Sequence, residues 1–397
     1  MPSRRASTLL ATAALLLAGL SGCSDADGSP DATATPPDVA RAVARTLDAR
    51  AHAVLHGDAA RFEHLLAGGP GFRAAQRTWF GNLTQLPVAR LRYRVHPDSL
   101  VREGDRYSVV ADVELELDGY DAGPVVAPGR FAFRAVPHHP SRFRLTGADL
   151  ADPQPWDLGP VEVREGDGVL GVFDAGSVAD APGLVASVES GIASVAAQVP
   201  YDWSRSVVVY ALSDPTFLDG LQDVPGDDPE DLDAVAFPVG DSTRVALNPR
   251  MLDEAGAERD RLVRHELTHV AVGTHDDDVP VWLSEGLAEY VSVRPLAPQD
   301  RRIPEAAVAA AEAGVDDLPD DASFNDDDSE AHYGLAWWAV ESLADSFGPS
   351  GPWQLLDALA EPGADPDEVL RDRFGTSMHQ LAEEADRLIL SLYAAGG

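Results

Sequence analysis

Two histidines, four residues apart, are the strongest candidates for chemistry in this chain. Residues 264–269 read R-H-E-L-T-H, so a helix would place His265 and His269 one turn apart on the same face. Both imidazoles could then bind one metal ion. Glu266 lies about 100° further around the helix, where it can polarise a metal-bound water without binding the metal. The segment therefore predicts a metal site with a glutamate as the general base.

A third ligand is expected, because catalytic zinc typically has three protein ligands and leaves its fourth position to water. Residues 282–290 read W-L-S-E-G-L-A-E-Y and predict a second helix, antiparallel to the first. From this helix, Glu285 can face the two histidines. Glu289, one turn further on, could accept a hydrogen bond from the non-ligating ring nitrogen of His265 or His269.

Together, the two segments resemble the gluzincin zinc peptidases and, among them, the peptidase MA-like domains often found in bacterial exported proteins. The resemblance is carried by four residues, His265, Glu266, His269 and Glu285. It implies that Glu285 and both histidines bind Zn²⁺ and that Glu266 is the catalytic base. In such domains a tyrosine commonly begins a later helix, and it can stabilise the oxyanion formed on the attacked carbonyl. Tyr333 is the matching residue, and His332 is the alternative.

A β-hairpin is predicted immediately before the metal-binding helix. Residues 234–239 and 243–247 have strand patterns on either side of the turn sequence G-D-S. Gluzincins align extended substrates by strand addition to an edge strand near the zinc, and this hairpin has a similar place in the order of elements. The resemblance thus assigns substrate alignment to Thr243, Arg244, Val245, Ala246, Leu247 and Asn248. The alternative is a hairpin that only closes the sheet.

Residues 1–23 have the pattern of a lipoprotein signal peptide. Arg4 and Arg5 precede an apolar run at residues 9–20, which is too short for a typical membrane span. The following L-S-G-C resembles a bacterial lipobox, which implies that Cys23 carries a lipid anchor. An ordinary signal peptide with an incidental cysteine is the alternative. We expect an extracytoplasmic protein, anchored to the bacterial cell membrane.

The composition is strongly acidic. The chain has 66 Asp and Glu against 30 Lys and Arg, a formal net charge of -36. This charge argues against a nucleic-acid partner, since phosphate binding needs a basic surface. Cys23 is the only cysteine, which excludes an intramolecular disulfide and a cysteine-rich metal site. The expected partners are a peptide or protein substrate and, through Cys23, a membrane.

The order of predicted elements indicates an α+β protein with two domains. Residues 24–37, rich in Asp, Thr, Ser and Pro, predict a flexible tether. Residues 38–155 predict helices at 39–66 and 72–86, followed by an antiparallel sheet. This domain, with its stretch A-V-L-H-G-D-A-A-R-F, resembles the cone-shaped nuclear transport factor 2-like domains.

A proline-rich connection, residues 152–160, predicts the linker to a second domain. Residues 156–397 predict a zincin-like domain with a small mixed sheet and a helical C-terminal half.

The predicted function is zinc-dependent hydrolysis of peptide bonds at the cell surface. A function of another class is a cell-surface binding lipoprotein whose zinc site is structural or degenerate. Structural zinc sites are usually closed by four protein ligands. His275, between the two helices, is the candidate for a fourth ligand and would distinguish this alternative.

Overall fold

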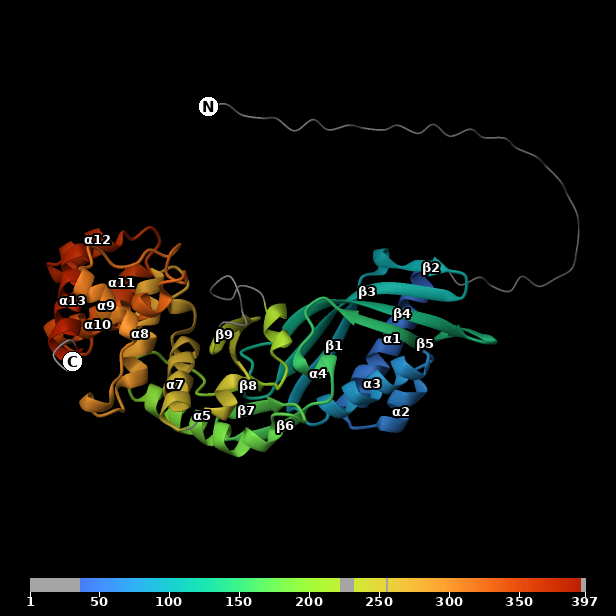
Figure 1. Cartoon of the computed structure of the whole chain (residues 1–397). Helices are drawn as coiled ribbons and strands as arrows, with labels where there is room; N and C mark the ends of the chain where they lie inside the picture. The colour runs from blue at the N-terminus through green and yellow to red at the C-terminus, as the bar shows by residue number, and fades with distance from the viewer. Residues whose placement is uncertain (1–35, 222–231, 255, 394–397) are drawn as a thin grey trace, which may run out of the picture.

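The computed structural model describes residues 36–221, 232–254 and 256–393. The predicted signal peptide, Cys23 and nearly all of the predicted tether lie outside these residues. The described part has two five-stranded sheets and a mainly helical C-terminal half, so the predicted α+β class and helical half are confirmed. In Figure 1 the helices α8 to α13 gather at one end, and the first sheet with α1 to α3 forms the other. Within the described residues, no helix is both long and apolar enough to span a membrane.

The first sheet is antiparallel, with the strand order β1-β3-β4-β5 and the short β2 paired to β3. Its strands are β1 (Val88–Val95), β2 (Val101–Glu103), β3 (Arg106–Leu117), β4 (Val125–Val136) and β5 (His139–Leu150). Alternate residues of β3, among them Val109, Ala111 and Val113, are buried in a core that also contains apolar residues of α1. The resemblance of this part to a cone domain stays a prediction.

The single helix predicted over residues 39–66 is wrong, because the chain turns at Gly57. α1 (Pro36–Leu55) ends before this glycine, whose φ of 62° favours a residue without a Cβ atom. A new helix, α2 (Ala59–His64), then begins with Asp58 as its N-cap, which accepts a hydrogen bond of 2.9 Å from the Arg61 N–H. The second predicted helix is present as α3 (Pro70–Leu83).

The second sheet is mixed and has the strand order β6-β7-β8-β10-β9. Its strands are β6 (Glu162–Gly166), β7 (Val169–Phe173), β8 (Val207–Ala211), β9 (Ala234–Val239) and β10 (Ser242–Leu247). All residues of β7 and β8 are buried, as expected for parallel strands that are covered on both faces. The crossover helix α5 (Ala181–Ala196) and the later α7 (Ala257–Val272) share one core with the sheet.

The predicted hairpin is confirmed, but the assignment of its second strand to substrate alignment is wrong. β10 pairs with β8 on one side and with β9 on the other, so residues 243–247 lie inside the sheet and β9 is the edge strand. The Arg244 side chain is fully buried, and Asn248 lies just beyond the strand, where its side chain donates to the Leu232 carbonyl. A hairpin pattern does not reveal which strand pairs onward, because that depends on a contact with the distant β8.

The remaining helices follow the second sheet and build the C-terminal half. They are α6 (Arg250–Asp253), α8 (Val281–Val293), α9 (Glu305–Ala313), α10 (Ser329–Phe347), α11 (Gly351–Leu359), α12 (Pro366–Val369) and α13 (Met378–Tyr393). α8 lies against α7 and α10, and α13 packs against α9 and α10. The large buried apolar residues of α8, α10, α11 and α13 belong to the same core as those of α5 and α7.

The predicted linker is a packed part of the structure. Within residues 152–160, the short helix α4 (Pro155–Leu158) carries Trp156, which is 1% exposed. Asn82 donates hydrogen bonds of 2.8 and 2.7 Å to the backbone carbonyls of Trp156 and Gly159. The apolar core of the first sheet continues without a break onto the face of the second sheet opposite α7. The two sheets are thus joined by a shared core, and the boundary at residue 155 stays a prediction.

Replacing Gly286 by Ala is expected to destabilise the protein by about 1–3 kcal/mol. This glycine of the W-L-S-E-G segment lies where α8 crosses α10, and a Cβ there would lie 2.6 Å from the backbone oxygen of Ala336. The loss should appear as a lower urea midpoint. Gly81→Ala in α3 is the control, because a Cβ there meets nothing within 4 Å and should be neutral or slightly stabilising. Equal midpoints for the two variants would contradict the close packing of α8 on α10.

Candidate metal centre

Helices α7 and α8 bring the three predicted ligands together. The Nε2 atom of His265 lies 3.1 Å from Glu285 Oε2 and 3.3 Å from His269 Nε2, and the third separation, His269 Nε2 to Glu285 Oε2, is 3.5 Å. A tetrahedral zinc ion with ligand bonds of 2.0–2.1 Å needs ligand atoms about 3.3 Å apart. The arrangement of these three atoms therefore fits a single zinc ion without rearrangement.

Close packing of three helices fixes this geometry. Gly191 of α5 lets α7 approach, since a Cβ there would lie 2.7 Å from the side chain of Leu267. On α8, Trp282, Leu283 and Leu287 are buried in the core, which turns Glu285 toward the histidines. The apolar residues thus set the orientation of both helices, and the polar residues between them face one another.

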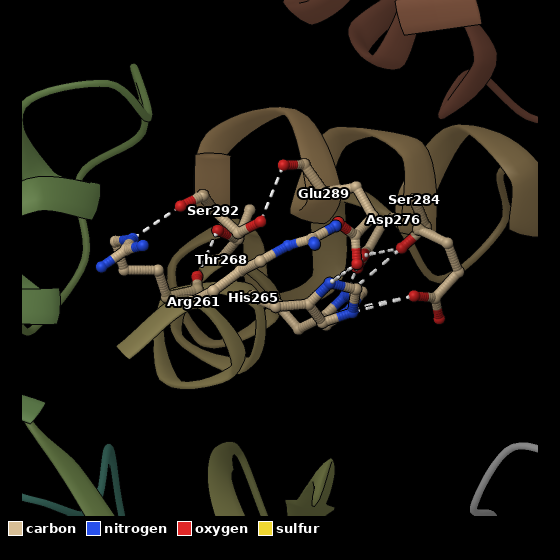
Figure 2. Close-up of polar contacts among 10 residues, drawn as sticks. Arg261, His265, Thr268, Asp276, Ser284, Glu289 and Ser292 are labelled. Atoms are coloured by element: carbon tan, nitrogen blue, oxygen red, sulfur yellow. Dashed lines mark hydrogen bonds and ion pairs between the residues drawn. The ribbon is translucent and has the colours of Figure 1, made fainter. Parts of the chain in front are cut away.

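The non-ligating nitrogen atoms of both histidines have carboxylate partners. His265 Nδ1 lies 3.1 Å from Glu289 Oε1, which settles the open choice between the two histidines (Figure 2). His269 Nδ1 has a longer contact of 3.5 Å with Asp276 Oδ2, and Ser284 Oγ donates to the same oxygen at 2.6 Å. Asp276 was not predicted, because nothing in the acidic loop distinguishes it from its neighbours. Such partners fix the ring orientation of metal-binding histidines.

The histidines and carboxylates of the site shift one another's pKa values toward the charged forms. Burial alone would lower the pKa of His265, but hydrogen bonds to Glu285 and Glu289 outweigh it and raise the pKa to about 9. Burial opposes ionisation of Glu289, yet the hydrogen bond with His265 and the charge of Arg261 lower its pKa to about 2. Despite burial, the histidines hold the pKa of Glu285 well below its usual range. Both carboxylates are therefore ionised at neutral pH, and a metal that binds here would displace the proton that they stabilise on His265.

Glu266 lies beside this group without belonging to it. Three side chains, those of His265, His269 and Glu285, form the metal-ligand group found in the described residues, and Glu266 lines the adjoining cleft. Burial raises the pKa of Glu266, while a hydrogen bond from the backbone N–H of Ala236 on β9 acts in the opposite direction. A carboxyl group with a raised pKa is suited to accept a proton and release it again.

Tyr333 and His332 differ in their relation to the site. Tyr333, near the start of α10, lines the cleft, and its hydroxyl hydrogen-bonds to Glu285. Burial and the nearby carboxylates raise its pKa well above the usual value, so the hydroxyl keeps its proton as a donor. His332 instead has Nδ1 2.9 Å from the Phe324 carbonyl. Of the two residues, Tyr333 is therefore the one that lines the cleft beside Glu285, and its role as an oxyanion donor stays a prediction.

His275 does not join the metal ligands. Its ring stacks on Tyr201 with ring centres 4.0 Å apart, and it is absent from the ligand group of the described residues. The structure thus offers no support for a fourth protein ligand at this position. An open position is typical of a catalytic rather than a structural zinc site.

A cleft of about 920 Å³ leads to the three ligands, with the edge strand β9 along one side. Its lining includes Glu266, Tyr333 and residues 234–238 of β9. It also includes residues 119–122, which come from the first sheet. The site therefore has room for an extended chain next to the metal ligands.

The C-terminal half of the chain, which contains the three candidate ligands, matches a known family. The protein-family profile described as Peptidase MA superfamily matches residues 187–390, a segment that contains all three predicted ligands and Glu266. The chain belongs to the Peptidase MA superfamily. This membership implies a protease-like enzyme, and such enzymes are typically metal-dependent. Neither the search of curated proteins nor the search of solved structures found a match.

Proposed function

We propose that this protein is a gluzincin-type zinc peptidase that hydrolyses peptide bonds at the cell surface. One observation carries the proposal: His265, His269 and Glu285 offer three ligand atoms at zinc spacing, in a cleft that also contains Glu266. Superfamily membership supports the hydrolytic activity. Zinc, rather than another divalent metal, is supported by the two imidazoles and one carboxylate with a glutamate base beside them.

Each residue has a role that follows from its position. Zinc bound by the three ligands would supply Lewis acidity, lowering the pKa of water and polarising the scissile carbonyl. Glu266 takes the proton of the attacking water and delivers it to the leaving amine. The Tyr333 hydroxyl, which keeps its proton, donates to the oxyanion of the attacked carbonyl. Glu289 and Asp276 hold the histidine rings in their ligating orientation.

The substrate strand of this proposal is β9 rather than β10. Val239 pairs with Ser242 across the two-residue turn, so the backbone groups of Ala236 and Pro238 point away from β10, toward the open edge. The hydrogen bond from the Ala236 N–H to Glu266 agrees with this register. An extended peptide pairing with β9 would thus lie beside the general base.

We also propose that Cys23 is lipidated and holds the enzyme on the outer face of the membrane. The support is the lipobox-like L-S-G-C after an apolar run, with its single cysteine at the position the signal requires. In the bacterial host, Cys23→Ser should move the protein from the membrane fraction to the soluble fraction. An unchanged membrane fraction for Cys23→Ser would contradict a lipid anchor at this residue.

The first test is the metal content of the chain without residues 1–23, combined with hydrolysis of a mixed peptide library. About one zinc per chain and cleavage that a chelator abolishes are expected. Zinc without cleavage would favour the binding lipoprotein. A chain that takes up no zinc would contradict both functions.

Loss of a histidine partner should weaken zinc binding. Glu289→Gln is expected to lower zinc affinity by about 10–100-fold, because the ring of His265 loses its carboxylate partner. Asp276→Asn should have a smaller effect, since its contact with His269 is longer. Competition with a chromophoric chelator measures both. Glu305→Gln, an exposed residue of α9, is the control, and an affinity for Glu289→Gln equal to that of this control would contradict the role of Glu289.

A further inference from the structure

We propose that the N-terminal sheet forms one wall of the substrate cleft, and that the composite cleft selects extended peptide segments carrying Arg or Lys. The inference rests on the proposed peptidase function and adds a substrate class to it. Its basis is the β3–β4 turn, residues 118–124, which reaches across from the first sheet to the second.

A buried ion pair fixes this turn to the second sheet. Arg244 Nη2 on β10 lies 3.0 Å from Asp121 Oδ1, and the two side chains are 1% and 0% exposed. The same guanidinium donates to Gln154 Oε1 at 2.9 Å and to the Tyr210 hydroxyl. Asp121 in turn accepts the Leu117 N–H at 2.8 Å, which ties the carboxylate to the end of β3. Four parts of the chain therefore meet at one buried ion pair: the end of β3 with its turn, Gln154, β8 and β10.

Three further hydrogen bonds hold the turn along the second sheet. The Ala122 N–H donates to Ser242 Oγ at 2.8 Å, at the β9–β10 turn. Ser206 Oγ donates to the Gly119 carbonyl at 2.6 Å, just before β8. The Tyr120 hydroxyl lies 3.3 Å from the Val169 carbonyl on β7. The turn is thus bonded to three different strands or their ends, so its position relative to the cleft is fixed.

The fixed turn and the catalytic groups line the same cleft. Residues 119–122 share its wall with Glu266 and with the β9–β10 turn at Gly240 and Asp241. Strand β9 runs from Ala236, beside Glu266, toward Gly240. At about 3.3 Å per residue, these positions are roughly 13 Å apart. A peptide that binds at Ala236 and runs alongside β9 past Pro238 would therefore reach the β3–β4 turn about four residues from the scissile bond.

The charge of the cleft favours a cationic occupant. Three exposed carboxylates, those of Asp202, Asp241 and Asp277, line it, and no Arg or Lys stands among its described lining residues. Among the carboxylates that line the cleft, Asp121 is paired with Arg244, whereas none of these three forms an ion pair with a described residue. Unneutralised carboxylates in a cleft attract positive charge and repel acidic segments.

The test compares peptides of otherwise identical sequence that carry Lys, Gln or Glu about four residues from the cleaved bond. The residue is placed on one side of that bond in one set of peptides and on the other side in a second set. With the full chain, kcat/KM should follow the order Lys, Gln, Glu at low salt and converge at high salt. Ala122 is exposed on the β3–β4 turn and lines the cleft, so Ala122→Arg places a cation there. It should reduce the Lys-to-Glu ratio of kcat/KM about tenfold. Ala75→Arg, an exposed α3 residue absent from the cleft lining, is the charge-matched control and should leave the ratio unchanged.

The outcomes separate this inference from the proposed function. Hydrolysis without a charge preference, or equal ratios for Ala122→Arg and Ala75→Arg, would overturn the inference and leave the peptidase intact. If the zinc-loaded chain cleaves nothing, the peptidase proposal fails. Binding of the same fluorescent peptides to Glu266→Gln then decides the inference, with tighter binding of the Lys peptide supporting it and equal binding overturning it.

Discussion

Glu266→Gln is expected to lower kcat/KM by about 10²–10⁴-fold while the protein keeps its zinc. The amide cannot accept the proton of the attacking water, and the three ligand atoms belong to other side chains. The amide oxygen can still accept the hydrogen bond from the Ala236 N–H, so the edge strand should keep its place. Initial rates on one peptide and the zinc content of the same sample provide the measurement.

Glu258→Gln is the matched control for this substitution. Glu258 lies on the same helix, in the exposed first turn of α7, and the change removes the same charge. It should keep both activity and zinc. An active Glu266→Gln enzyme would contradict the mechanism, and a Glu266→Gln protein without zinc would show that this glutamate is needed to hold the metal.

Arg244→Met should destabilise the protein by about 3–5 kcal/mol, because it leaves the Asp121 carboxylate buried without its cation. Tyr210 and Gln154 also lose a hydrogen-bond donor, and the guanidinium 5.3 Å from the Trp156 ring centre is lost. Urea unfolding of the full chain measures the effect. The catalytic groups do not contact Arg244, so any activity loss below the unfolding midpoint would arise from displacement of the β3–β4 turn.

A double-mutant cycle shows whether the loss of stability in Arg244→Met arises from the unpaired charge of Asp121. Asp121→Asn alone should also destabilise the protein, because Arg244 is then buried without its anion. The double variant should lose clearly less unfolding free energy than the sum of the two single variants, since neither charge remains buried. Additive losses would contradict direct coupling between the two side chains. Arg164→Met, in an exposed pair with Glu162, is the control and should change stability by about 0–1 kcal/mol.

The close grouping of the three candidate ligands was predictable because its signals are local. The four-residue spacing of His265 and His269 and the recurrence of a glutamate at Glu285 depend only on helix geometry and on a short connection. The sequence did not decide whether Glu289 pairs with His265 or His269, since both histidines are at a similar distance along the chain. Asp276 gave no signal, because an acidic residue in an acidic loop looks like any solvated neighbour.

Long-range pairing explains the errors in the fold. The hairpin of β9 and β10 follows from its turn, but the choice of edge strand depends on the parallel contact between β10 and β8. The prolines of residues 152–160 predicted a linker, and they gave no sign that Trp156 within it is buried in the shared core. The pairing of Arg244 with Asp121 crosses more than a hundred residues and has no local pattern.

The proline in β9 affects how readily copies of the enzyme aggregate. An exposed edge strand is a template on which other chains can stack, and repeated stacking leads to aggregation. Pro238 faces this open edge without an N–H, so a continuous ladder of hydrogen bonds cannot extend past it. A short peptide could thus pair with the edge next to Glu266. A longer strand from a second copy of the chain would lose its backbone hydrogen bonds at Pro238.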